Sequence, residues 1–132
     1  MGQVKPDFSQ AADFSPIPNR IYNAVVEDAE DFIADNDNKT PMIKITYNVL
    51  DSAPFKDRKG HDANTQGRKL FRNYPLAGRG SGFLRLLLEA LKVEEDKFTD
   101  TKMLIGKRCK LQANEEEYEG VPQSRVKRVL PV

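Results

Sequence analysis

The order of the strand-like and helical segments constrains the fold of this chain more than any other feature. Three segments with strand-like alternation come first, one short helical segment follows, and two more strand-like segments complete the chain. The clearest alternation covers residues 42–50, where polar residues separate Ile43, Ile45, Tyr47 and Val49. Because every second residue of a strand points to the same face, these four residues predict one buried face of a sheet.

Shorter patterns place the remaining elements. We expect one helix from about Ser81 to Lys92, and five strands at about residues 20–28, 42–50, 68–74, 107–114 and 124–130. After the first strand, an acidic stretch that reaches Asn38 predicts a turn. Residues 51–67 predict a long polar loop. For the third strand the sequence does not decide which face is buried, because both of its faces carry apolar side chains.

Strand-strand-strand-helix-strand-strand is the order of elements in the OB-fold, a small barrel of five strands. We therefore expect an all-β protein with one helix, folded as a five-stranded OB-fold barrel over residues 20–132. Residues 1–19 hold three prolines and show no sustained periodicity, so we expect an irregular N-terminal arm there. OB-folds bind single strands of nucleic acid or oligosaccharides, although a fold alone does not define a function.

Composition argues against several classes of function. The chain has a single cysteine, Cys109, and a single histidine, His61, so an internal disulfide, a zinc cluster and a histidine-activated nucleophile are not expected. We expect no enzymatic activity, no cofactor and no metal. No apolar run approaches the roughly 20 residues that span a bilayer, and the N-terminus lacks the layout of a signal peptide. We therefore expect a soluble cytoplasmic protein that makes no membrane contact.

The basic residues are unevenly distributed, although the net charge is only +1. Residues 68–85 carry five positive charges and no acid, and further bases cluster in residues 107–112 and 125–128. In the run RKLFRNY (68–74), bases and aromatic rings are interleaved. This combination binds single strands, because cations neutralise the phosphates while rings stack on the bases, at roughly 1–3 kcal/mol per base. The pattern predicts a single-strand site on the third strand and its neighbours.

The candidate site draws cations from several strands. The residues expected to neutralise phosphates are Lys44, Lys69, Arg72, Arg79, Arg108, Lys110, Arg125 and Lys127. Phe71 is the ring expected to stack on bases, and Tyr47 and Tyr74 are two further stacking candidates. The alternative for Phe71 is a place in the core, and the sequence favours neither interpretation.

Five segments of the chain also share the order and spacing of a known family. They are IYNAVVEDAED (21–31), TPMIKITYNVLD (40–51), GRKLFRNYPL (67–76), a leucine-rich helix (83–91) and LIGKRCKLQANEEEYEGVPQSRVKRVLP (104–131). In these segments the chain resembles a family of small phage-encoded proteins, once filed as a domain of unknown function and regarded as single-stranded-DNA-binding proteins of OB type. The resemblance implies DNA binding that is largely independent of sequence, in phage DNA replication or recombination within the host cytoplasm. It implies no catalytic residues.

Two features depart from this family and two alternatives stay open. Residues 51–67 form a longer loop than the family pattern suggests, and the chain ends in VKRVLPV instead of an acidic tail that recruits partners. A protein-interaction adaptor would use the same scaffold, with its contacts on that loop or on the arm that holds Phe8 and Phe14. An RNA-binding OB domain would use the same rings and cations. Partnership with phage replication or recombination proteins and a homo-oligomeric state are also left open.

Overall fold

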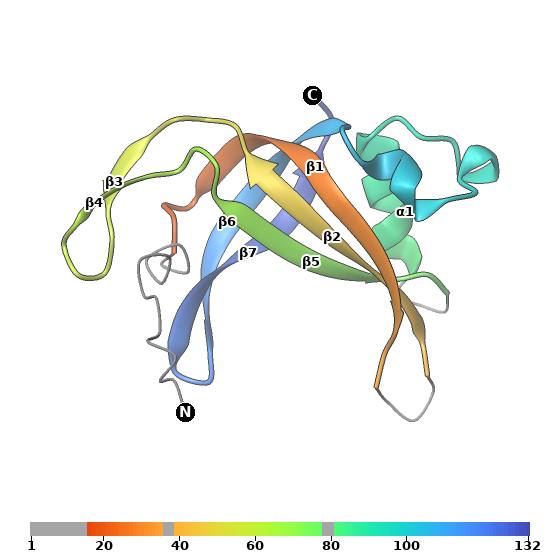
Figure 1. Cartoon of the computed structure of the whole chain (residues 1–132), viewed down its shortest axis with the longest axis horizontal. Helices are drawn as coiled ribbons and strands as arrows, with labels where there is room; N and C mark the ends of the chain where they lie inside the picture. Colours follow the sequence, from red (N-terminus) through yellow and green to blue (C-terminus); the bar gives the residue numbers. More distant parts are fainter. Residues whose placement is uncertain (1–15, 36–38, 78–80) are drawn as a thin grey trace, which may run out of the picture.

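A five-stranded antiparallel sheet, with the strand order β5-β2-β1-β6-β7, forms most of the molecule (Figure 1). The computed structural model describes residues 16–35, 39–77 and 81–132. The strands of the sheet are β1 (Arg20–Ile33), β2 (Pro41–Val49), β5 (Lys69–Pro75), β6 (Arg108–Tyr118) and β7 (Val121–Leu130). The described part has one α-helix, followed by two short 3₁₀ helices: α1 (Ser81–Ala90), η2 (Glu95–Lys97) and η3 (Thr101–Leu104). The expected mostly β chain with one helix is therefore confirmed.

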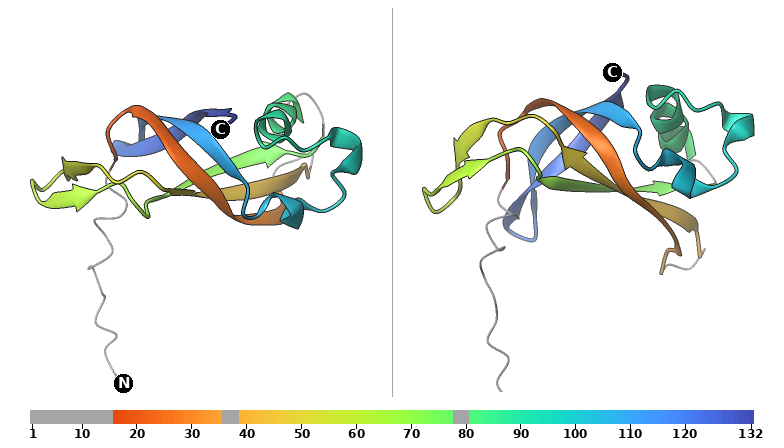
Figure 2. Two further views of the ribbon diagram at one scale, coloured as in Figure 1. Left: turned by 90° about the horizontal axis from the view of Figure 1, so that it is seen from above. Right: turned by 45° about the horizontal axis from the view of Figure 1, so that its top comes forward.

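The sheet is strongly curved but is not closed into a barrel. Figures 1 and 2 show β6 and β7 passing behind β2 and β5, so that the two edge strands of the sheet face each other. No strand pairing joins β5 to β7 within the described residues. Instead, Nη1 of Arg72 in β5 donates hydrogen bonds to the carbonyl oxygens of Val126 (3.2 Å) and Lys127 (3.4 Å) in β7. A side chain therefore spans the gap that a strand ladder would fill in the expected closed barrel.

The buried side of the curved sheet follows the alternation of the sequence. The four apolar residues of β2 are fully buried, as predicted, and β1 adds Tyr22, Ala24 and Val26 to the same core. The helix α1 covers one end of the sheet (Figure 1) and buries Leu84, Leu87 and Leu88. Each such leucine contributes roughly 1.5–3 kcal/mol when it leaves water, so this end of the core depends on the helix.

The structure shows which face is buried in β5, which is the third of the five predicted strands. Leu70 and Tyr74 point into the core, and Arg72 on the same face is half-buried. Lys69, Phe71 and Asn73 are exposed on the other face. Of the two interpretations of Phe71, the structure therefore selects the outward one.

Strand β1 continues through most of the acidic stretch that was expected to form a turn. It reaches Ile33 and pairs with β2 along the way, so Asp31 lies opposite Ile43 and Phe32 lies opposite Met42. A β-bulge between Val26 and Asp28 shifts the register. The expected turn over this stretch is wrong because β2 supplies backbone partners while the acidic side chains stay in solvent. The expected tip at residues 36–38 lies outside the described residues.

The long polar loop expected at residues 51–67 contains a second, two-stranded sheet of β3 (Pro54–Lys56) and β4 (Asp62–Asn64), which the sequence analysis did not predict. Its tip is organised by Asp57, whose Oδ1 accepts hydrogen bonds from the backbone N–H groups of Lys59 (2.9 Å) and His61 (2.8 Å). Its base is fixed by the buried Thr65, whose hydroxyl accepts from the N–H of Ala53 at 3.0 Å. This hairpin and α1 lie at opposite ends of the molecule (Figure 1). Within the described part of the chain, no helix has the length and apolar character needed to cross a membrane.

Candidate nucleic-acid interface

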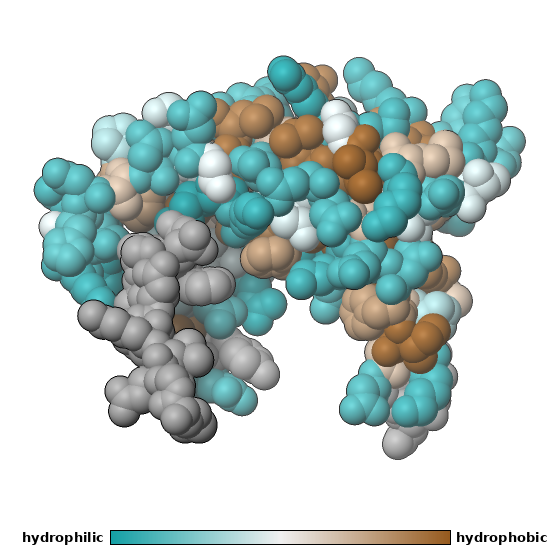
Figure 3. Space-filling view, viewed as in Figure 1, coloured by the Kyte–Doolittle hydropathy of each residue, from teal (hydrophilic) through white to brown (hydrophobic). Residues whose placement is uncertain are grey.

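A groove of about 770 Å³ runs over the outer face of β1, β2 and β5 and ends against β6 and β7. Figure 3 shows the surface hollowed beside the β1–β2 hairpin, which projects downward at the right of the view. The residues that line the groove are Glu30, Phe32, Lys44, Phe71, Arg72, Asn73, Glu116, Arg125 and Val126. It is therefore built from segments that lie far apart in the sequence and are joined by strand pairing.

The first exposed ring of this groove is Phe71, whose surface is 45 % exposed. It lies opposite Thr46 of β2, on the face turned away from the core. Nζ of Lys44 is 4.8 Å from the centroid of the Phe71 ring. A cation at this distance interacts favourably with the face of the ring. The pair therefore offers a flat apolar surface and a positive charge to the same ligand.

The second exposed ring is Phe32, which is 37 % exposed and which the sequence analysis did not identify. It lies opposite Met42, near the end of β1. The residue sits in the acidic stretch that was expected to form a turn, and the bulge after Val26 reverses the alternation of the strand. A pattern with uninterrupted period two would have assigned Phe32 to the core face, so only knowledge of the bulge could have placed it in the groove.

The two rings lie on a diagonal that crosses three strands, with Lys44 between them. Met42 and Thr46, which mark the positions of the rings along β2, are four residues apart, about 13 Å at the usual rise of a strand. The rings belong to the strands on either side of β2, so their Cα atoms are roughly 16 Å apart for strand spacings near 4.8 Å. One base cannot bridge that distance, so each ring would take a different base of the same strand.

The charges of the groove are mixed and favour an anion only modestly. Three lining residues are basic and two are acidic. Two of the predicted phosphate ligands at its border are engaged in ion pairs: Lys69 with Glu27 at 3.1 Å, and Lys127 with Glu116 at 3.3 Å. Exposed pairs of this kind contribute only about 0–1 kcal/mol. A phosphate group can therefore replace the carboxylate at little cost.

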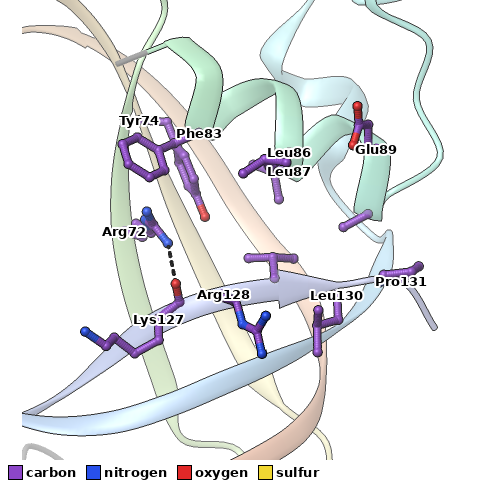
Figure 4. Close-up of a pocket in the computed structure, with 12 residues that line it drawn as sticks. Arg72, Tyr74, Phe83, Leu86, Leu87, Glu89, Lys127, Arg128, Leu130 and Pro131 are labelled. Atoms are coloured by element: carbon purple, nitrogen blue, oxygen red, sulfur yellow. Dashed lines mark hydrogen bonds between the residues drawn. The ribbon is translucent and has the colours of Figure 1, made fainter. Parts of the chain in front are cut away.

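Arg72 differs from the other predicted cations because it is half-buried and already bonded to two carbonyl groups of β7. Its guanidinium carbon lies 5.1 Å from the ring centroids of both Tyr74 and Phe83 (Figure 4). Hydrogen bonds to carbonyl oxygens leave the positive charge in place, so Arg72 still contributes to the potential of the groove. Its principal contacts, however, hold β5 against β7.

The structure does not bring all of the predicted residues to the groove. Arg108 and Lys110 are exposed on β6, opposite Val25 and Asn23 of β1, and they are not among the residues that line it. Arg79 lies outside the described residues. Of the predicted residues, the groove itself therefore contains Lys44, Phe71, Arg72 and Arg125, and Lys69 lies two residues before Phe71 on the same face of β5.

The expectation that Tyr47 and Tyr74 stack on bases is wrong. Both rings are buried in the core, and their hydroxyl groups form a hydrogen bond with each other at 2.6 Å. Burial raises the pKa of Tyr47 well above its usual value and also raises the pKa of Tyr74. The two tyrosines thus form a paired polar contact within an apolar core and present no free ring face on which a base could stack.

Cys109 is also part of this core. Burial raises the pKa of its thiol to about 12. The thiol is therefore protonated at neutral pH, and a protonated thiol is a poor nucleophile. Among the described residues, no group of three or more histidine, cysteine, aspartate or glutamate side chains is placed to hold a metal ion.

The groove thus combines exposed rings and three cations with two acidic side chains on one sheet. No protein-family model matches the sequence, and no curated protein matches it.

Proposed function

We propose that this chain is a non-enzymatic single-stranded-DNA-binding protein with a fold of OB type. The observation that carries the proposal is the diagonal of Phe32, Lys44 and Phe71 on the floor of one groove. Rings that stack on bases and cations that follow the phosphates are what a single strand needs for binding that is independent of sequence. A duplex offers no such access, because its bases are already stacked on each other.

The arrangement of the strands supports the OB type. Numbered by their order in the chain, the sheet strands are arranged third-second-first-fourth-fifth, and the helix lies between the third and the fourth. OB-folds are partly open five-stranded barrels that bind oligonucleotides on the second and third strands, between two loops. Here the groove lies on β2 and β5, the second and third strands of the sheet, and meets the β6–β7 hairpin. The hydrogen bonds from Arg72 to β7 span the gap between the two edge strands, which is the gap expected of a partly open barrel.

The resemblance to phage-encoded proteins suggests where this activity acts. We propose that the chain coats single-stranded DNA during phage DNA replication or recombination in the host cytoplasm. Coating requires affinity without preference for a base sequence, and stacking on Phe32 and Phe71 meets this requirement because every base presents a flat face. Contacts of Lys44, Arg125 and the neighbouring Lys69 with phosphates make the affinity fall as salt rises.

The test is a titration of the full chain into labelled oligomers followed by fluorescence anisotropy. The set comprises a thymidine oligomer of about 10 nucleotides, within the site size of one OB-fold, a matched duplex, and a uridine RNA oligomer. We expect salt-sensitive binding to the DNA single strand and weak binding to the duplex. Absence of binding at low salt overturns the proposal, and preference for the RNA oligomer changes the substrate to RNA.

A pair of variants assigns the binding to the groove. Phe71→Ala removes the ring beside Lys44 and should weaken binding by about 1–3 kcal/mol, roughly 5- to 150-fold in Kd. Ile105→Ala is the control, because Ile105 is 41 % exposed and lines neither this groove nor the groove between α1 and β7 in Figure 4. Thermal unfolding of both variants checks that the fold is retained. Equal losses of affinity in the two variants would contradict the assignment.

A further inference from the structure

A second groove, of about 560 Å³, separates α1 from β7 (Figure 4). Its walls include Phe83 and Leu86 of the helix and Val129 and Leu130 of the strand. Phe83 and Leu86 are 54 % and 58 % exposed, which places them among the most exposed large apolar side chains of the described residues. Clustered apolar side chains at a groove mark an interaction surface more often than isolated ones do.

The border of this groove is predominantly basic. Lys127 and Arg128 of β7 and Arg72 of β5 line it, against one acid, Glu89 of α1. Lys127 forms an exposed ion pair with Glu116, which a stronger acidic partner can replace at little cost. The hydrogen bonds that Arg72 donates to β7 go to uncharged carbonyl groups. Nε of Arg128 donates a hydrogen bond to the side-chain oxygen of Gln112. Gln112 is uncharged, so this bond does not neutralise the positive charge of Arg128. An occupant that suits the groove must therefore combine apolar and acidic side chains.

The chain itself carries a surface of that composition at the β1–β2 hairpin. Ile33 is 61 % exposed, and Asp31 precedes it on the same face of β1. Asp31 lies opposite Ile43 and Ile33 lies opposite Pro41. Residues that face each other across an antiparallel pair point to the same side of the sheet. Asp31 and Ile33 therefore point to the side that Ile43 shares with the core, at the end of the hairpin where the core stops. Within the described part of the chain, Asp31 has no ion-pair partner.

We propose that this acidic hairpin face of one protomer docks into the basic α1–β7 groove of a second copy of the chain. Ile33 would pack on Phe83 and Leu86, and Asp31 would approach the bases at the border of the groove. The two surfaces are different parts of the chain, so the contact is heterologous, with each copy using its hairpin on one neighbour and its groove on another. Repetition of a heterologous contact gives a ring or an open row of protomers.

The contact is compatible with occupation of the first groove. Phe32 and Glu30 line that groove, and in a strand they point away from Asp31 and Ile33. One hairpin thus serves nucleic acid with one face and the neighbouring protomer with the other. If the proposed DNA binding holds, adjacent protomers on one strand touch each other, and binding becomes cooperative.

Self-association is tested without nucleic acid, so the result does not depend on the proposed DNA binding. Sedimentation velocity of the full chain over a concentration series should show a sedimentation coefficient that rises with concentration, and less so at high salt. Ile33→Lys and Leu86→Glu should each raise the concentration needed for association by about tenfold or more. Ile105→Lys is the matched control, because Ile105 is exposed and belongs to neither surface.

A mixture of the two disruptive variants gives the sharpest result. The Leu86→Glu chain keeps an intact hairpin and the Ile33→Lys chain keeps an intact groove, so a 1:1 mixture should form dimers and nothing larger. A wild-type chain that stays monomeric at every concentration overturns the proposal. Association that survives both substitutions, or a mixture that does not associate, overturns it as well.

A DNA titration separates this proposal from the proposed function. On an oligomer long enough for several protomers, wild type should bind with a steep isotherm, whereas Ile33→Lys should bind with a shallow isotherm and an unchanged Kd for an oligomer of about 10 nucleotides. If self-association is found but no oligomer binds, the DNA-binding proposal fails and the protomer contact stands. If the oligomers bind but the chain never associates, the contact fails and DNA binding stands.

Discussion

The two grooves of this molecule share Arg72 and each contains exposed phenylalanine, yet their surroundings differ. In the groove over β1, β2 and β5, the two rings lie on either side of Lys44 on the outer face of the curved sheet. In the α1–β7 groove, Phe83 stands beside Leu86 on a helix, opposite aliphatic residues of a strand. An exposed ring therefore says little by itself, because its neighbours determine whether it suits a base or an apolar side chain.

The largest effect is expected for the residue that the two grooves share. Arg72→Ala removes the hydrogen bonds to Val126 and Lys127 and the packing against two rings. The variant should lose about 2 kcal/mol in the free energy of unfolding, since bonds from charged groups contribute roughly 1.5–3 kcal/mol. Urea denaturation measures this loss. Arg108→Ala, on the outer face of β6, should stay within about 0.5 kcal/mol of wild type; similar losses in both variants would show that the bridge to β7 has no special role.

The next effect separates the two faces of the β1–β2 hairpin. Phe32→Ala should weaken binding to an oligomer of about 10 nucleotides by about 1–3 kcal/mol, because one stacking surface is lost. Ile33→Ala changes the neighbouring residue on the opposite face and should leave that Kd unchanged. Anisotropy measures both variants. A loss in Ile33→Ala as large as that in Phe32→Ala would mean that the hairpin binds as a whole and that its faces are not distinct.

A smaller effect distinguishes cations of the groove from cations elsewhere on the sheet. Lys44→Ala removes a charge from the groove floor, so the slope of log K against log salt should become shallower by about 0.7, the value for one phosphate contact on a single strand. Lys110→Ala removes an exposed charge from β6, outside the groove, and should leave the slope unchanged. Equal changes in slope would place the phosphate path over β6 as well.

The smallest effect concerns the β3–β4 hairpin, none of whose residues lines either of the two grooves. Backbone N–H groups of His61 and Lys59 hold the pKa of Asp57 below its usual value. A carboxyl group with a lowered pKa in the folded state stabilises the fold above its unfolded pKa, near 3.9. This stabilisation is lost as the pH falls from there through the lower, folded pKa. Amide exchange of the hairpin should accelerate in this acidic range, and less so in Asp57→Asn, whereas the amides of β2 should be unaffected.

Much of the fold could be predicted because it depends on local alternation. The apolar residues of β2, the helix near Ser81 and the outline of all five strands follow from periods of two and of about 3.6 residues. The buried hairpin contacts of Thr65 and Asp57 were not predictable, since they satisfy backbone groups that only the folded loop brings together. Such bonds leave no periodic trace in a sequence.

The candidate site was predictable to a lesser degree. Phe71 and Lys44 were identified because bases and rings are interleaved on β5 and alternate with core residues on β2. Tyr47 and Tyr74 were misassigned because the sequence does not show that each hydroxyl would find the other in the core. Phe32 was missed because a single bulge reverses the alternation of its strand. Residue type was thus an insufficient guide both where the register shifted and where polar rings paired with each other in the core.

That bulge has a consequence for how the chain can change. Glu27 is the inserted residue, and its carboxylate is anchored by Asn48 of β2 and Lys69 of β5. Deletion of this one residue would remove the bulge and leave Phe32 on the outer face and Ile33 on the core side, because Val26 and Asp28 would then alternate as neighbours in a regular strand. A regular strand that kept Glu27 would instead exchange the two faces of the hairpin and drive acidic groups against the core. In this strand the bulge, and not only the identity of the side chains, determines which side chains share a surface.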